Sequence, residues 1–139
     1  MTSSPTATYS RTTADQTEAN RAIAIDFLRQ ASAGHARDAM RKYAAPRFVH
    51  HNPYFGNDAD TLAAAMDENA RSNPDKVMEI MRTIAEGPLV AVHSRVQLKP
   101  SDAPLAVVHV LRIEDGRIHE FWDVAQPVPA DTPNEAGMF

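Results

Sequence analysis

Two ionisable residues stand inside otherwise apolar segments, and both residue types carry proton-transfer chemistry. Asp123 follows the aromatic pair Phe121 and Trp122, and His109 lies among aliphatic residues in the segment 107–111. Carboxylates and imidazoles are common general acids and bases in enzymes. Asp123 is either paired and structural, or held in a pocket where the loss of solvent makes it a stronger base. A histidine such as His109, taken alone, is more often a satisfied core residue, so its role depends on whether it meets Asp123.

The connection at residues 114–116, Glu-Asp-Gly, decides whether the two side chains can cooperate. In a three-residue loop with glycine in the left-handed bulge position, Ile113 pairs with Arg117, and His109 and Asp123 share one face of the sheet. His109 then lies opposite Phe121, and Val107 lies opposite Asp123. In a two-residue turn His109 instead lies opposite Trp122, and Asp123 points to the other face. We favour the three-residue loop.

Further polar side chains are predicted to line the same pocket. His50 and His51 are adjacent in a predicted strand, so they project to opposite faces, and we expect His51 to enter the pocket with Asn52. His93 has the same parity as its strand neighbour Arg95 and is also expected to point inward. Phe121 and Trp122 are included among the predicted substrate contacts, although Trp122 suits the core or a dimer interface better than a substrate platform.

The sequence predicts neither a metal site nor a bound cofactor. It contains no Cys, which excludes thiolate catalysis and zinc–thiolate sites. No two of its six histidines have HxxxH or HxH spacing with an acidic third ligand. We also find no glycine-rich phosphate loop and no nucleophile elbow.

Composition excludes several other function classes. The chain has 139 residues, a formal net charge of -4 and no run of Lys or Arg, so we expect no nucleic-acid partner. No apolar run approaches the roughly 20 residues that cross a bilayer, and the N-terminus lacks the pattern of a signal peptide. We therefore expect a cytoplasmic protein without a membrane partner.

The surrounding elements predict an α+β fold in one domain. Residues 1–17 include nine Ser or Thr and are predicted to form a flexible tail before a single domain over 18–139. Apolar periodicity predicts a helix from residue 18 to Gly34 with Thr17 as N-cap, followed by further helices and strands. The predicted helices cover 18–34, 36–45 and 60–71, and the predicted strands cover 47–55, 77–86, 89–96, 105–113 and 117–125.

This order places helices on one face of a mostly antiparallel sheet. The strand 105–113 is apolar on both faces apart from His109 and Arg112, as in a central strand that is covered on both sides. Since an uncovered apolar face would leave a large sticky patch, we predict a homodimer.

Several ordered motifs together resemble the SnoaL-like proteins of the NTF2-like superfamily. They include Phe-Val-His-His-Asn-Pro at 48–53, the segments 84–94 and 108–118, Glu-Phe-Trp-Asp-Val at 120–124, and the closing Gly-Met-Phe. The likeness spans about residues 20–139. It implies an NTF2-like conical barrel, with N-terminal helices packed on a curved, mostly antiparallel sheet.

In polyketide cyclases of this type, a pocket aspartate removes a proton next to a carbonyl group, and a histidine and an asparagine assist the enolate. The resemblance gives Asp123 the acid/base role, His109 the assisting role, and His51 and Asn52 the pocket lining. It implies a cofactor-independent cyclase or isomerase for a small apolar carbonyl compound. Two alternatives remain open: a hydrolase that uses an Asp-activated water on an epoxide or lactone, and a non-catalytic ligand-binding or interaction module.

Overall fold

The computed structural model describes residues 11–139 as three helices and five strands. The helices are α1 (Ala14–Ser32), α2 (Ala36–Tyr43) and α3 (Ala59–Ser72). The strands are β1 (Ala44–His50), β2 (Val77–Glu86), β3 (Leu89–Gln97), β4 (Leu105–Glu114) and β5 (Arg117–Pro127).

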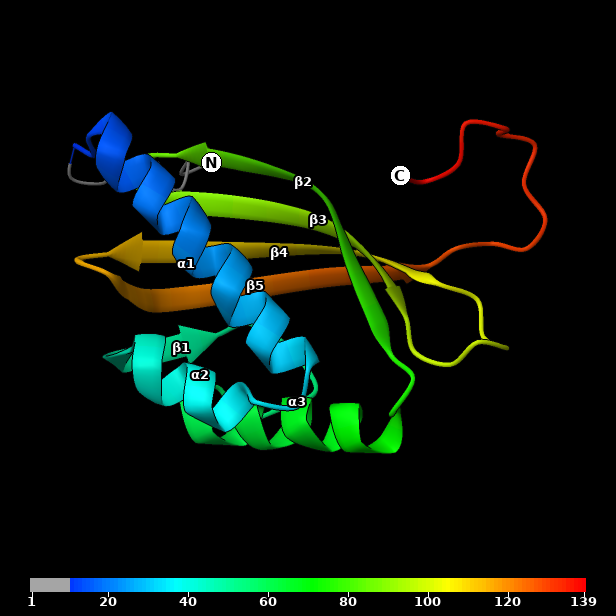
Figure 1. Ribbon diagram of the computed structural model, residues 1–139, viewed down its shortest axis with the longest axis horizontal. Coiled ribbons are helices and arrows are strands. Elements are labelled where there is room, and N and C mark those ends of the chain that lie inside the picture. The colour runs from blue at the N-terminus through cyan, green and yellow to red at the C-terminus, as the bar shows by residue number, and fades with distance from the viewer. Residues whose placement is uncertain (1–10) are drawn as a thin grey trace, which may run out of the picture.

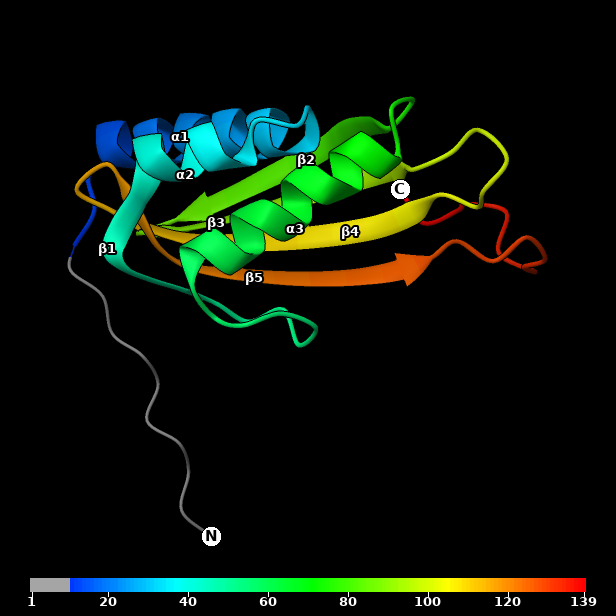
Figure 2. The same ribbon diagram turned by 90° about the horizontal axis from the view of Figure 1, so that it is seen from below.

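All five strands form one sheet, and the three helices lie on one of its faces (Figure 2). The strand order is β1-β5-β4-β3-β2, with β1 parallel to β5 and every other neighbouring pair antiparallel. Helix α1 crosses the sheet, while α2 and α3 lie towards its β1 edge (Figure 1). The predicted α+β architecture is therefore confirmed. We call the helix-covered face the inner face and the opposite one the outer face.

Helix α1 begins earlier than the sequence pattern predicted. Thr13, not Thr17, is the N-cap: its hydroxyl accepts the backbone N–H of Gln16, and the Gln16 side chain accepts the backbone N–H of Thr13. This reciprocal capping box stabilises the first turn. The predicted flexible tail thus cannot extend to residue 17, and its first ten residues lie outside the described part of the chain.

Strand β1 is also displaced from its predicted position at 47–55. It begins directly after α2 and ends at His50, because the buried His50 side chain bonds to the loop that follows. Its ring Nε2 donates to the backbone carbonyl of Gly56, and its Nδ1 accepts the backbone N–H of Asn52. These bonds fold residues 51–58 into a loop that leads to α3.

The β4–β5 hairpin differs from our favoured prediction in its turn. Asp115 and Gly116 both have positive φ, 51° and 73°, as in a two-residue type I′ turn, and Glu114 pairs with Arg117. The predicted pairing of Ile113 with Arg117 is therefore wrong.

A bulge in β5 then places His109 and Asp123 on the same face of the sheet, as the three-residue loop would have done. Ile113 pairs with Ile118 but Arg112 pairs with Glu120, so β5 carries one extra residue at this point. Beyond the bulge His109 lies directly opposite Asp123, two positions from the predicted register. The same-face prediction for these two residues is confirmed, but by a turn and a bulge that the sequence did not indicate.

The hydrophobic core occupies the half of the inner face nearest the hairpin. Phe27 of α1 packs edge-to-face on Phe121 of β5, with ring centroids 5.9 Å apart, and both side chains are fully buried. Leu111 and Ile118 are equally inaccessible beside them. Burial of such side chains contributes about 1.5–3 kcal/mol each, which anchors the strands that continue towards the other half of the face.

None of the described helices combines the length with the hydrophobicity needed to cross a bilayer.

Candidate active site

A cavity of about 760 Å³ occupies the half of the inner face that the core leaves open. Its walls come from α1, α3, the loop after β1 and four strands, and they are mostly apolar. The apolar lining includes Leu28, Leu62, Met66, Met78, Val96, Leu105, Val107 and Ala125. This volume lies in the range of small-molecule sites, which combine apolar walls with a few placed polar groups.

Asp123 lies in this cavity and is held by Asn52. The Asn52 amide Nδ2 donates to Asp123 Oδ2 over 3.0 Å, and the backbone N–H of Tyr54 donates to Asn52 Oδ1 over 3.0 Å. The second bond fixes the amide so that its N–H groups face the carboxylate. Asp123 Oδ1 has no hydrogen-bond donor within residues 11–139 and is free to act on a ligand.

The loop after β1 places Asn52 through His50. Because Nε2 of His50 donates to a carbonyl and Nδ1 accepts a backbone N–H, the ring is held as the neutral Nε2–H tautomer. The predicted roles of the two adjacent histidines are thus reversed. His50 points to the inner side and holds the loop that carries Asn52, while His51 points to the outer face.

His109 lines the cavity beside Asp123. Residues directly opposite each other on antiparallel strands have Cβ atoms about 5 Å apart, so the two side chains share one region of the wall. The imidazole lies on the Phe121 ring, with centroids 5.4 Å apart, and its Nδ1 is shielded from solvent without a hydrogen-bond partner among the described residues.

Burial keeps His109 uncharged. Removal from solvent lowers the pKa of His109 from 6.5 to about 4, although the Asp123 carboxylate opposes this and the Lys76 ammonium adds to it. The imidazole is therefore neutral at pH 7, with one N–H donor and one unprotonated nitrogen. A neutral imidazole still carries one N–H group, which can donate a hydrogen bond to a developing oxyanion.

Several polar residues of the cavity wall were not predicted from the sequence, among them Lys76 and Asn69. Lys76, just before β2, enters the wall and donates from Nζ to Asn69 Oδ1 over 2.9 Å. Lys76 precedes a strand and Asn69 lies near the end of a helix, so both positions resemble ordinary surface sites in the sequence. Only the way α3 lies against the sheet brings them to the cavity.

His51 and Trp122 lie on the outer face and not in the cavity, where we had expected them to contact the substrate. Trp122 pairs with Val110, and its ring stacks on His51 with centroids 5.0 Å apart. His51 Nε2 lies 2.7 Å from Glu120 Oε2, and this carboxylate also accepts from Arg112. Strand alternation separates this cluster from Asp123 by the thickness of the sheet.

His93 and Phe121 also differ from their predicted positions. His93 pairs with Val108 on the outer face, bonds to Arg82 and stacks on the ring of Phe139, so it does not point inward. Phe121 has the predicted inward orientation but is completely buried in the core and supports the cavity floor under His109. Of the predicted polar residues, only Asp123, His109 and Asn52 meet in the cavity.

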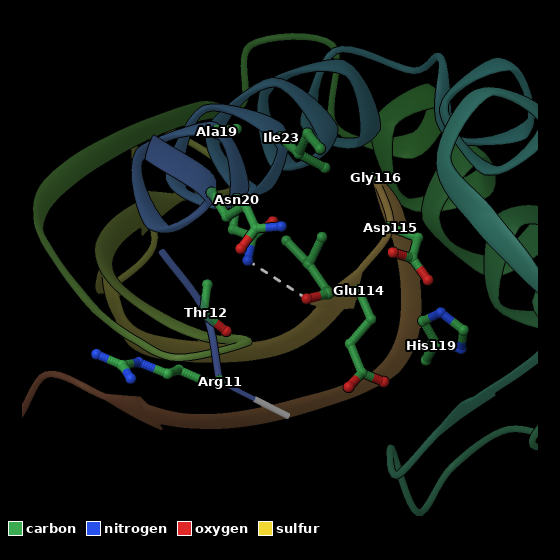
Figure 3. A pocket seen from close by; sticks show the side chains of 11 residues that line it. Arg11, Thr12, Ala19, Asn20, Ile23, Glu114, Asp115, Gly116 and His119 are labelled. Carbon is green, nitrogen blue, oxygen red and sulfur yellow. Dashed lines mark hydrogen bonds between the residues drawn. The ribbon is translucent and has the colours of Figure 1, made fainter. Parts of the chain in front are cut away.

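A second cavity, of about 380 Å³, lies at the hairpin end of the molecule (Figure 3). Its walls come from the segment before α1, from α1 itself and from the β4–β5 turn, and the side chain of Asn20 donates to the Ile113 carbonyl inside it. Glu114, which faces it, is already bonded to Arg112. None of the sequence-predicted site residues lies there.

The part of the chain from residue 11 onward holds no group of three His, Asp or Glu side chains arranged to bind a metal ion. The polar groups of the larger cavity include the carboxylates of Asp123 and Glu68, the neutral imidazole of His109, the ammonium of Lys76 and the amides of Asn52, Asn69 and Asn73.

The family model of the SnoaL-like domain matches residues 24–121. No curated protein sequence matches the chain. Solved structures with the same fold include a proposed polyketide cyclase from Bacillus cereus ATCC 10987, with a TM-score of 0.71 and 16% identity over 83% of this chain and 79% of that one.

Two further solved structures share the fold. A proposed ketosteroid isomerase from Kribbella flavida DSM 17836 has a TM-score of 0.65 and 22% identity, covering 88% of this chain and 96% of that one. AclR, a proposed hydroxylase from Streptomyces galilaeus, has a TM-score of 0.67 and 19% identity, covering 79% and 90%. At these identities the structures establish an NTF2-like fold and no more. Because the family model matches more than half of its length, the chain belongs to the SnoaL-like domain family of the NTF2-like superfamily.

Proposed function

We propose that this protein is a cofactor-independent acid/base enzyme that removes a proton next to the carbonyl group of a small, largely apolar compound. Asp123 is the general base and His109 the hydrogen-bond donor to the enolate oxygen. The observation that carries the proposal is the position of Asp123 in an apolar cavity of about 760 Å³, held by Asn52 and paired across the sheet with an uncharged imidazole.

The reaction follows from which atoms are free. Asn52 occupies Oδ2 of Asp123, so Oδ1 takes the proton from the α-carbon of the ligand. The electron pair of the broken C–H bond moves to the carbonyl oxygen, where the N–H of neutral His109 stabilises the negative charge. The protonated Asp123 then returns its proton to another carbon, as in an isomerase. Alternatively, the enolate carbon attacks a second carbonyl of the same molecule, as in an aldol cyclase, and the alkoxide that forms takes the proton back from Asp123.

The state of the cavity favours catalysis over a binding module. A non-catalytic module predicts either a cavity filled by side chains or an aspartate engaged in a structural ion pair. The cavity is open, and Asp123 forms no salt bridge with any residue from 11 onward. The proposed activities of the cyclase and isomerase neighbours are consistent with proton transfer.

A hydrolase remains the second candidate, because the same residues could activate a water molecule. Asp123 would take a proton from a water held by the Asn52 amide, and the hydroxide would attack an epoxide or lactone. The C–O bond of the ring breaks, and the released oxygen takes the proton back from Asp123. The specific observation that favours it is the direct Asn52–Asp123 bond, which places a donor and an acceptor side by side for one water molecule.

The test is deuterium exchange at the α-carbon of apolar ketones and 1,3-dicarbonyl compounds, followed by NMR. The proposal predicts exchange by the wild-type protein and a loss of about 100-fold or more in Asp123→Asn. Circular dichroism would establish that the variant is folded. Wild-type protein that is folded but exchanges none of these compounds would contradict the proposal and favour the hydrolase.

A further inference from the structure

Lys76 gives the cavity a positive charge that the proposed proton transfer does not use. It is the only Lys or Arg among the residues that line this cavity in the described chain. Its ammonium group has three N–H donors, of which one is bonded, to Asn69. Two donors remain for a ligand.

No carboxylate of residues 11–139 neutralises Lys76. Glu68, an acidic side chain of the cavity wall, is paired with Arg71 over 2.7 Å and accepts from the Ser72 hydroxyl. Asp123 lies on β5, which β4 and β3 separate from β2, the strand that Lys76 precedes. A partly buried cation without a counter-ion is costly, and burial accordingly lowers the pKa of Lys76. An anion bound beside it would offset this cost.

The wall around Lys76 is supported from behind. Asn73 donates to the backbone carbonyl of Asn69 over 2.8 Å, and Lys99 donates to Asn73 Oδ1 over 2.6 Å and to the Ser72 carbonyl over 3.2 Å. These bonds hold the end of α3, and with it the Asn69 amide that orients the Lys76 ammonium. The position of the cation is therefore built into the fold and is not that of a free surface lysine.

We propose that Lys76 binds an anionic group of the substrate, so that the substrate is a keto acid whose carboxylate is separated from the reacting carbonyl by an apolar body. This inference rests on the proposed function for the location of the reacting carbonyl. Charge fixes the orientation: Asp123 repels the carboxylate, and Lys76 attracts it to the other side of the cavity. Lys76 acts as a specificity-determining residue and does not touch the reacting atoms.

The test compares the binding of 4-oxo-4-phenylbutanoate and of its methyl ester by isothermal titration calorimetry at pH 7. A charge-assisted hydrogen bond in a cavity of this kind predicts that the wild-type protein binds the acid at least about tenfold more tightly than the ester. The preference should disappear in Lys76→Met and persist in Lys76→Arg. It should also persist in Lys99→Met, the matched control, because Lys99 lies close by but outside the cavity lining.

Asp123→Asn separates this inference from the proposed function. This variant should keep the preference for the acid even when exchange is lost, since it retains the cation. Equal affinities for acid and ester in the folded wild-type protein would overturn the inference, as would a preference that survives in Lys76→Met or is lost equally in Lys99→Met. Loss of the preference in Lys76→Arg, together with a covalent adduct on Lys76 after borohydride reduction, would also overturn it, because Lys76 would then act as an amine nucleophile.

Discussion

Two histidine–carboxylate pairs lie back to back on opposite faces of the sheet. On the inner face His109 lies opposite Asp123, and on the outer face His51 lies 2.7 Å from Glu120. Each pair lies beside an aromatic ring, that of Phe121 or that of Trp122. The residue types are nearly identical, so any difference in chemistry must come from the surroundings.

The outer pair is open to water and embedded in a charge network. The side chains of His51 and Glu120 are 46% and 24% exposed, and Arg112 bridges Glu120 to Glu114. Solvent-exposed contacts of this kind contribute little to stability, and the Glu120 carboxylate already accepts from Arg112. The inner pair instead lies in an apolar cavity that leaves Asp123 Oδ1 free and the imidazole uncharged. The comparison teaches that the cavity, and not the presence of a histidine and a carboxylate, makes a site reactive.

The largest expected effect concerns stability as a function of pH. The pKa of His109 is lowered in the folded state from 6.5 to about 4, so below pH 6.5 the unfolded chain binds a proton that the folded chain does not. The resulting stability loss grows as the pH falls from about 6.5 to about 4 and totals about 3 kcal/mol. Urea unfolding across this range should show a smaller loss for His109→Gln than for wild type.

His35→Gln is the control for this effect, because His35 is exposed. Its unfolding free energy should follow the wild-type pH dependence. If the unfolding free energy of His109→Gln falls with pH as steeply as that of wild type, the pH effect does not come from the burial of His109.

The next effect tests the residue that orients the base. Asn52→Ala removes the donor to Asp123 Oδ2, and a hydrogen bond to a charged group contributes about 1.5–3 kcal/mol, so the exchange rate should fall about tenfold to hundredfold. A fall in the exchange rate that accompanies loss of the folded state, followed by circular dichroism, would instead indicate a purely structural role for Asn52.

The adjacent residue is the matched control for Asn52. His51→Gln alters the outer face one position earlier in the chain and should leave the exchange rate within about twofold of wild type, as is usual away from a site. Equal losses in the two variants would contradict the separation of the two faces.

The smallest effect on catalysis is expected from the outer face, which we propose pairs with a second copy of the chain. Val124 and Ile84 are 71% and 67% exposed there, and none of the three described helices covers this face (Figure 2). Light scattering should give a dimer mass for wild type and a monomer mass for Val124→Glu, with exchange retained. Ser101→Glu adds the same charge to an exposed loop and should stay dimeric; a monomeric wild type at micromolar concentration would refute the pairing.

Much of the fold was predictable because its signals are local. Helical periodicity and the Asp-Gly turn identify the helices and the hairpin, and the central position of β4 follows from its two apolar faces. The prediction that His109 and Asp123 share one face depended only on the alternation of side chains along the two strands. The extra residue at the β5 bulge follows from packing and leaves no mark in the residue types.

The candidate site was predictable only in part, for similar reasons. Alternation shows that His50 and His51 face opposite ways, but which one faces inward depends on how β1 joins β5 as a parallel edge strand. For the same reason His93 was predicted to face inward: alternation along its strand does not tell which of the two sets of side chains faces the helices. Lys76 and Asn69 are seven residues apart, on either side of the turn between α3 and β2, and it is the packing of α3 on the sheet that brings both to the cavity.

The central claim is that the inner carboxylate is the base and the outer one is not. The most direct measurement is α-carbon deuterium exchange of one ketone by wild type, Asp123→Asn and Glu120→Gln at equal protein concentration, with folding checked for each. The account predicts a loss of about 100-fold or more in Asp123→Asn and a rate within about twofold of wild type in Glu120→Gln. Exchange that persists in Asp123→Asn, or that falls equally in both variants, would contradict it.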